Sequence, residues 1–258
     1  MIIEQNKYEK EFLSRIVQSQ SLSVISYILW YHHYERESID FSYSLDPFSY
    51  IYRYENKYYL FGENFWELAK NIRWFKDNII LIFQNKNIWN EIVEKFDNFR
   101  SLETNKPAQT FNTYLTLYLT QDAFSCINSN KELILKIPSE KYPILKRYRH
   151  LKNGLNFGLI KNNKIVSFAS APHIMTGYTT SFAVLRGVET NMLERGQGYA
   201  QVTVSKLCKE LFTKFEVKYI FLWVEENNFA GIKIYNNLGF KEAVKIYTSY
   251  CDLKSKFT

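Results

Sequence analysis

Apolar and polar residues follow two periods along this chain, and each change of period marks an expected boundary between elements. Apolar side chains that recur every three or four residues indicate amphipathic helices, whereas strict alternation indicates half-buried strands. In the first half the pattern predicts helices at 8–20, 21–35, 64–75 and 86–98, a hairpin at 49–62, strands at 78–84 and 110–119, and a loop at 101–110. In the second half it predicts helices at 139–154, 197–214 and 229–238, a hairpin at 156–171, and strands at 179–189, 218–225 and 241–252. Strands and helices thus alternate, which indicates an α/β or α+β protein.

The order of these elements repeats along the chain. Each half contains a hairpin, a helix, a strand, a helix and a strand, and the helix at 139–154, with Pro143 in its first turn, joins the halves. We therefore expect a diverged α/β domain at 1–138 and a second domain at 139–258. The shared outline also raises the hypothesis of a duplicated fold.

Composition narrows the class of protein. The chain has 258 residues, of which 46% are hydrophobic, and this is enough for a core in each of two domains. Its longest apolar runs, 23–31 and 79–83, are far shorter than the roughly 20 residues that span a bilayer, and its amino terminus lacks the layout of a secretory signal. The three cysteines, Cys126, Cys208 and Cys251, are far apart and lack metal-ligand spacing. We expect a cytoplasmic protein without a membrane segment and without a metal.

Positive charge is concentrated in the second half. The net charge is +7, and residues 131–258 hold 20 Lys and Arg against 10 Asp and Glu, whereas the first 130 residues hold 13 against 16. This polarity favours an anionic ligand for the second half. The basic cluster at 146–150 is too short, and too isolated, to indicate nucleic-acid binding.

The segment "ERGQGYA" at 194–200 lies where an expected strand meets an expected helix. The first turn of a helix exposes unpaired N–H groups and the positive end of the helix dipole, and glycines let the backbone close around phosphate oxygens. The dinucleotide-binding fingerprint does not fit, because Gln201 stands where the third glycine is needed, and the Gly-Lys-Ser/Thr of a P-loop is absent. The segment therefore predicts a phosphate site of another kind.

Two motifs resemble the GNAT N-acyltransferase superfamily. That family's Arg/Gln-x-x-Gly-x-Gly/Ala signature is matched by the run from Arg195 to Ala200, and its second motif, an asparagine followed by a helix ending in Tyr-x-x-x-Gly-Phe, is matched by Asn228, Tyr235 and the Gly-Phe pair at 239–240. The resemblance covers residues 150–252 and implies a mixed twisted sheet flanked by helices and split at its centre to take the pantetheine arm of acetyl-CoA. It assigns the coenzyme to Val188, Thr190, Arg195, Gly196, Gln197, Gly198, Tyr199, Ala200, Asn228 and Tyr235.

The resemblance also implies direct attack by an amine on the thioester, in a ternary complex. Tyr235 corresponds to the family's general acid, although the same position on the helix is also suited to core packing. The family's frequent catalytic glutamate is missing, since position 184 is valine and the stretch 167–188 contains no acidic residue. Glu189 is the nearest acidic residue for the general base, ahead of Glu225 and Glu226, and a water relay competes with all three.

Two other functions stay open at the level of sequence. One is a CoA-binding sensor or scaffold without catalysis, which the missing glutamate favours. The other is an aminoacyl-tRNA-dependent transferase built from paired GNAT-like domains, which the intact phosphate-loop residues disfavour. We expect an N-acetyltransferase for a small-molecule amine that binds neither nucleic acid nor a membrane, and the sequence leaves homo-oligomer formation open.

Overall fold

A computed structural model of the chain describes residues 39–45, 48–54, 57–62, 78–83, 87, 100–101, 112–127, 133–136, 154–176 and 181–252. The chain divides into two compact units, one formed by residues 1–115 and 243–258, and the other by residues 116–242. The first unit is therefore completed by the carboxyl end of the chain. The predicted domains, 1–138 and 139–258, are a different division and stay a prediction.

The first unit contains a mixed sheet. Its strands are β1 (Ile39–Leu45), β2 (Phe48–Tyr54), β3 (Lys57–Phe61), β4 (Asn78–Phe83), the two-residue β5 (Arg100–Ser101) and β12 (Lys241–Asp252). The order β1-β2-β3-β4-β12 is antiparallel except for the parallel pair β3/β4, and β5 pairs with β12. The hairpin predicted at 49–62 is confirmed by β2 and β3, and the strand predicted at 78–84 by β4. The strand β1 was not predicted.

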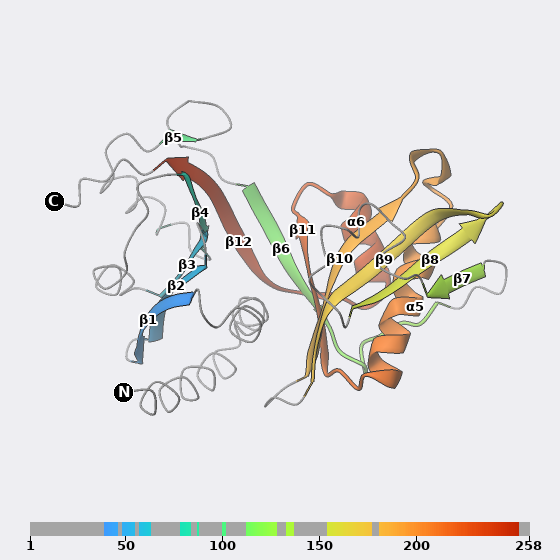
Figure 1. The fold of residues 1–258 in the computed structure, drawn as a ribbon, viewed down its shortest axis with the longest axis horizontal. Coiled ribbons are helices and arrows are strands. Elements are labelled where there is room, and N and C mark those ends of the chain that lie inside the picture. The colour runs from blue at the N-terminus through green and yellow to red at the C-terminus, as the bar shows by residue number, and fades with distance from the viewer. Residues whose placement is uncertain are drawn as a thin grey trace. The chain divides into compact units, whose positions relative to one another are not determined.

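The second unit contains the rest of the described elements (Figure 1). These are the second part of β6 (Asn112–Leu119), whose residues 112–115 belong to the first unit, and β7 (Leu133–Lys136), β8 (Leu155–Lys161), β9 (Lys164–Met175), β10 (Phe182–Thr190), the 3-10 helix η3 (Met192–Glu194), α5 (Tyr199–Lys214), β11 (Tyr219–Glu225) and α6 (Phe229–Asn237). Strand order is β6-β11-β10-β9-β8-β7, with β10 and β11 parallel. A parallel pair needs a crossover connection, which here is α5. The predicted class, a mixed sheet flanked by helices, is confirmed.

The hairpin β8/β9 shows how local sequence sets register. Asn162 and Asn163 form its two-residue turn with φ of 48° and 59°, and these left-handed conformations are the ones that a type I′ turn requires. Asparagine tolerates the left-handed region better than most residues. The predicted turn at this pair is therefore confirmed.

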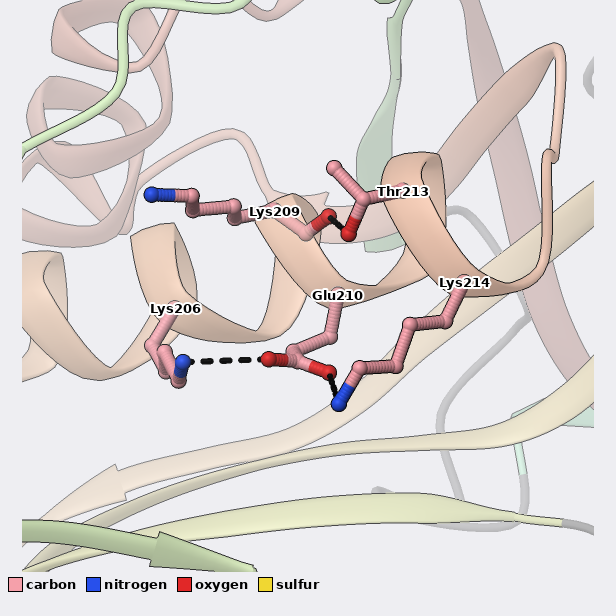
Figure 2. A network of polar contacts seen from close by, with 5 residues as sticks. All are labelled: Lys206, Lys209, Glu210, Thr213 and Lys214. Carbon is pink, nitrogen blue, oxygen red and sulfur yellow. Dashed lines mark hydrogen bonds and ion pairs between the residues drawn. The ribbon is translucent and has the colours of Figure 1, made fainter.

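Helix α5 packs one face onto β8, β9 and β10. Val204, Leu207, Cys208 and Leu211 are all fully buried, and their spacing places them on one helical stripe. On another face, Glu210 accepts from Lys206 at 3.0 Å and from Lys214 at 2.5 Å (Figure 2). These two lysines lower the pKa of the Glu210 carboxyl, with Lys214 the larger cause. Pairs of this kind stabilise a helix modestly, so the network supports α5 but does not position the site.

The two units repeat one pairing scheme. In the first, β1, β2 and β3 pair antiparallel in order and β3 then pairs parallel with β4. In the second, β8, β9 and β10 do the same and β10 pairs parallel with β11. The shared scheme is what the hypothesis of a duplicated fold requires.

Some predicted elements lie outside the described residues. These are the helices at 8–20, 21–35, 64–75, 86–98 and 139–154, apart from single residues at 87 and 154. Among the helices that are described, none combines the length and the apolar character needed to cross a membrane.

Candidate active site

The parallel strands β10 and β11 separate part of the way along their length. They pair only at Phe182–Tyr219, Ala183–Ile220 and Val184–Phe221, although β10 continues for six residues and β11 for four. Beyond Val184 the edge of β10 that faces β11 therefore has no ladder partner on that strand. Backbone donors and acceptors along such an edge are suited to pair with an extended ligand.

A β-bulge lies in the separated part of β10. Arg186 is opposite Ser170 of β9 and Glu189 is opposite Phe168, so three steps on β10 match two on β9. A bulge re-aims the local backbone and is common beside active sites. Val188, one of the predicted coenzyme residues, is half-buried within it.

The carboxyl end of β10 is hydrogen-bonded to β9, its neighbour in the sheet, and to the loop that follows it in the sequence. The hydroxyl groups of Ser167 and Thr190 are hydrogen-bonded at 2.9 Å, and Ser167 Oγ also donates to the carbonyl oxygen of Glu189 at 3.2 Å. Arg195 Nε donates to the carbonyl oxygen of Thr190 at 3.3 Å. The first residue of the predicted signature therefore closes the loop back onto the strand.

Between Thr190 and Arg195 the chain forms a capped 3-10 turn. The side chain of Asn191 accepts from the N–H of Leu193 at 3.0 Å, which is a helix cap, and its own N–H donates to the carbonyl oxygen of Val166 at 2.8 Å. The loop is thus tied to β9 before the glycines begin.

Gly196 and Gly198 form an open cradle at the amino end of α5. Their φ angles are +80° and +79°, a region that favours glycine, and a Cβ built at either position would meet nothing within 4 Å. Gly198 is the residue before α5, whose first-turn N–H groups, those of Tyr199, Ala200 and Gln201, have no intrahelical acceptor. Open space, free donors and the helix dipole together fit an anionic phosphate group.

A lysine from the β8/β9 hairpin stands beside this cradle. Lys161 Nζ lies 2.8 Å from Glu194 Oε2 and 5.7 Å from the ring centroid of Tyr199. Its pKa is raised, mainly by the hydrogen bond with Glu194. The predicted residue Gln197 is exposed within the loop, and Tyr199 and Ala200 are half-buried at the start of α5. Lys161 places a positive charge next to the predicted pyrophosphate site.

Asn228 lies at the same edge of the sheet, because it follows β11 directly and β11 runs parallel to β10. Its side-chain oxygen accepts from the N–H of Gly231 at 3.0 Å and so caps α6. A Cβ at Gly231 would lie 2.9 Å from Nδ2 of Asn228, which explains why glycine accompanies this conformation of the cap. The cap determines where α6 begins, and hence where its side chains lie.

Tyr235 is a buried residue of α6, with 9% of its surface exposed. Its ring packs edge-on against Phe240, with centroids 5.6 Å apart. Burial, followed by the nearby thiol of Cys208, raises the pKa of the phenol to about 12. The hydroxyl therefore stays protonated at neutral pH and is able to donate.

The three acidic residues proposed as bases are all exposed. Glu189 is near the end of β10, and Glu225 and Glu226 are at the end of β11. All three therefore lie at the edge where the two strands have separated. Of the three, Glu189 alone belongs to β10, in the part of the strand that pairs with β9 but not with β11.

The two faces of the sheet carry different residues around the split. Lys206 of α5 lies over the ring of Phe157, so Phe157 marks the face that α5 covers. Cross-strand register places Ser167 and Thr190 on this face. The loop that begins after Thr190 therefore leads from the α5 face of the sheet.

The opposite face carries a polar row that sequence reasoning missed. Asn156, Ser170 and Arg186 are directly opposite one another on β8, β9 and β10, and Ser170 Oγ donates to Asn156 Oδ1 at 2.5 Å. The guanidinium of Arg186 lies 5.8 Å from the ring centroid of Trp223 on β11. Glu189 is on this face too, since it is opposite Phe168, two residues from Ser170.

A separate surface cavity of about 690 Å³ opens near the amino end of β11. None of the predicted site residues lines it. Its lining residues are Thr120, Gln121, Asp122, Phe212, Thr213, Glu216, Val217, Lys218 and Tyr219. Because β10 and β11 are parallel, this cavity lies at the end of the strands away from the glycine loop.

Comparisons with known proteins agree with this geometry. Residues 122–240 match the model of the acetyltransferase (GNAT) family. No curated protein matches the sequence. Among solved structures, an acetyltransferase from the GNAT family of Colwellia psychrerythraea is 15% identical, with 93% of this chain and 96% of that chain covered and a TM-score of 0.51.

Two further solved structures are similar to a comparable degree. The GCN5-related N-acetyltransferase from Kribbella flavida is 10% identical, covering 79% of this chain and 86% of that chain with a TM-score of 0.51. The GCN5-related N-acetyltransferase from Sphaerobacter thermophilus is also 10% identical, covering 80% of this chain and 77% of that chain with a TM-score of 0.50. At these identities the likeness shows the fold.

Proposed function

Residues 122–240 form a domain of the GNAT acetyltransferase family, and from this premise we propose that the protein transfers an acetyl group from acetyl-CoA to an amine. The observation that carries the proposal is the early separation of β10 from β11 beside an open glycine cradle at the amino end of α5. An extended arm with a pyrophosphate at one end matches both features. Bound acetyl-CoA would supply an acetyl group already activated as a thioester.

Coenzyme binding is proposed for the residues that surround these two features. The first-turn N–H groups of α5, with Gly196 and Gly198, would hold the pyrophosphate, and Lys161 beside Tyr199 would add positive charge. The unpaired edge of β10 near Val188 and Thr190 would pair with the pantetheine arm. Because charge contributes much of this binding, added salt should weaken it.

The transfer itself needs three contributions from this chain. As the amine nitrogen bonds to the carbonyl carbon and the carbon–sulfur bond breaks, the amine proton must leave and the sulfur must gain one. We assign the proton acceptor to Glu189, directly or through water, and the proton donor to the protonated phenol of Tyr235. A backbone N–H in the bulge of β10 would stabilise the negative charge that develops on the carbonyl oxygen. Solvent then restores both side chains, so no covalent enzyme intermediate is required.

The proposed setting of this reaction is the cytoplasm, with a small-molecule amine as the acceptor. The described cysteines, exposed Cys126 and buried Cys208, are not joined in a disulfide, and this agrees with a reducing compartment. No group of acidic, histidine or cysteine side chains in the described part of the chain is arranged to hold a metal ion. Direct attack by the amine needs none.

The test is to incubate the full-length protein with acetyl-CoA and a panel of primary amines. Turnover is measured as release of the free thiol of CoA. We expect amine-dependent thiol release that saturates with acetyl-CoA. If the protein binds CoA tightly but no amine is acetylated, a sensor or scaffold role replaces the enzymatic one.

A further inference from the structure

We propose that Arg186 and Trp223 form an acceptor subsite that selects amines carrying a carboxylate, such as amino acids. The proposal rests on the proposed acetyl transfer and names the class of acceptor that this same site takes. It also assigns a role to the polar row on the face of the sheet opposite α5.

Position is the first argument. Arg186 is two residues beyond Val184, the last residue of β10 that pairs with β11, and Trp223 is two residues beyond the matching Phe221. The two side chains therefore lie on either side of the split, at its start. Since α5 and the glycine loop occupy the other face, an amine that approaches the split from the opposite face passes this pair.

The geometry of the guanidinium is the second argument. Arg186 lies over the face of Trp223 at 5.8 Å, which is within the range of cation–π attraction. This contact holds the guanidinium at the start of the split, and a guanidinium carries its N–H donors in one plane. A planar fork of donors matches the two oxygens of a carboxylate better than it matches a neutral group.

The surroundings of Arg186 are the third argument. Across β9 and β8 its row continues into Ser170 and Asn156, which are 1% and 6% exposed and hydrogen-bonded to each other. Buried polar groups in a sheet are costly unless they are paired, so this row departs from the apolar pattern of the core.

Glu189 completes the match to an amino acid. Glu189 lies on the same face of the sheet as Arg186. Across the bulge, their partners on β9 are two residues apart. That is about 7 Å along a strand. One cationic and one anionic side chain at this spacing complement an acceptor with one carboxylate and one amine, with the amine held at the proposed base.

The experiment compares each standard L-amino acid with its carboxamide as acceptors for full-length protein and acetyl-CoA. We expect wild type to prefer amino acids by about 10- to 100-fold in kcat/KM, the range of a charge-assisted hydrogen-bonded pair. Arg186→Gln should abolish that preference, and Arg186→Lys should keep part of it because it retains the charge but not the planar fork. Lys164→Gln, which removes the same charge from the exposed end of the hairpin, should leave the preference as in wild type.

Equal use of acids and amides by wild type, or an unchanged preference in Arg186→Gln, would overturn the proposal. If no amine of either kind is acetylated, the proposed acetyl transfer itself fails. In that case calorimetry tests the subsite separately, by measuring how tightly each amino acid and its carboxamide bind to CoA-loaded protein. Preferential binding of the acids that disappears in Arg186→Gln supports it, and the absence of such binding refutes it.

Discussion

At the scale of the residue, Tyr235 combines packing with chemistry. Its ring packs against Phe240, and burial raises the pKa of its phenol to about 12. Tyr235→Phe removes only the hydroxyl and preserves the ring contact, so the fold should be retained. We expect kcat to fall about 100-fold, the usual scale of general acid catalysis.

The pH profile gives a second measurement of this residue. A phenol with a raised pKa stays protonated as the pH rises from 7 to 10, so wild-type kcat should show no alkaline loss from Tyr235 in that interval. If Tyr235→Phe retains wild-type kcat at saturating amine, Tyr235 is a core residue only. Steady-state rates across this pH range decide between the two roles.

Contacts between residues that are distant in the sequence could not be predicted from the sequence. The run from Arg195 to Ala200 is identifiable because its members are adjacent, and its two glycines have left-handed backbones with open space around them. Lys161 contacts Glu194 across 33 residues, and Ser167 contacts Thr190 across 23, so neither contact has a local signal. Arg186 and Trp223 meet only because two strands are neighbours. Strand register, which the sequence does not specify, brings these side chains together.

At the scale of the element, α5 contributes both a phosphate-binding end and a buried thiol. Cys208 is fully buried, and burial raises the pKa of its thiol far above the ordinary value near 9. The unfolded chain releases this proton above about pH 9 whereas the folded chain retains it. The free energy of unfolding should therefore fall as the pH rises above 9.

Cys208→Ala should reduce that alkaline slope by up to about 1.4 kcal/mol per pH unit, the contribution of one proton. Urea unfolding followed by circular dichroism between pH 8 and 10.5 measures the slope. The matched control is Cys126→Ala, because Cys126 is exposed. Identical slopes for Cys208→Ala and wild type would show that the thiol does not remain neutral in the folded state.

Elements of the second half were predicted closely. The hairpin turn, β11, α6 and β12 were expected within a residue or two of where they lie, because each has a clear period and a strong boundary residue. The strand β7 and the turn η3 were missed, since four and three residues are too few to show a period. The bulge in β10 had one available signal, the isolated Gly187 inside a strand pattern.

At the scale of the whole molecule, the two units share a pairing scheme but not a phosphate loop. The connection from β10 to α5 contains Gly196 and Gly198 after Arg195. The corresponding connection after β3, residues 62–77, contains one glycine and no copy of the signature. We therefore expect one molecule of acetyl-CoA per chain, bound by the second unit.

Calorimetric titration of the full-length protein with acetyl-CoA tests the central claim most directly. Wild type should bind one equivalent, Gly198→Asp should lose at least about tenfold in affinity because it places a negative charge at the pyrophosphate site, and Gly198→Asn should lose much less. Asparagine has nearly the same shape and tolerates the left-handed backbone, so the difference between the two variants reports charge. Absence of binding by wild type, or equal affinities for the two variants, would contradict the account.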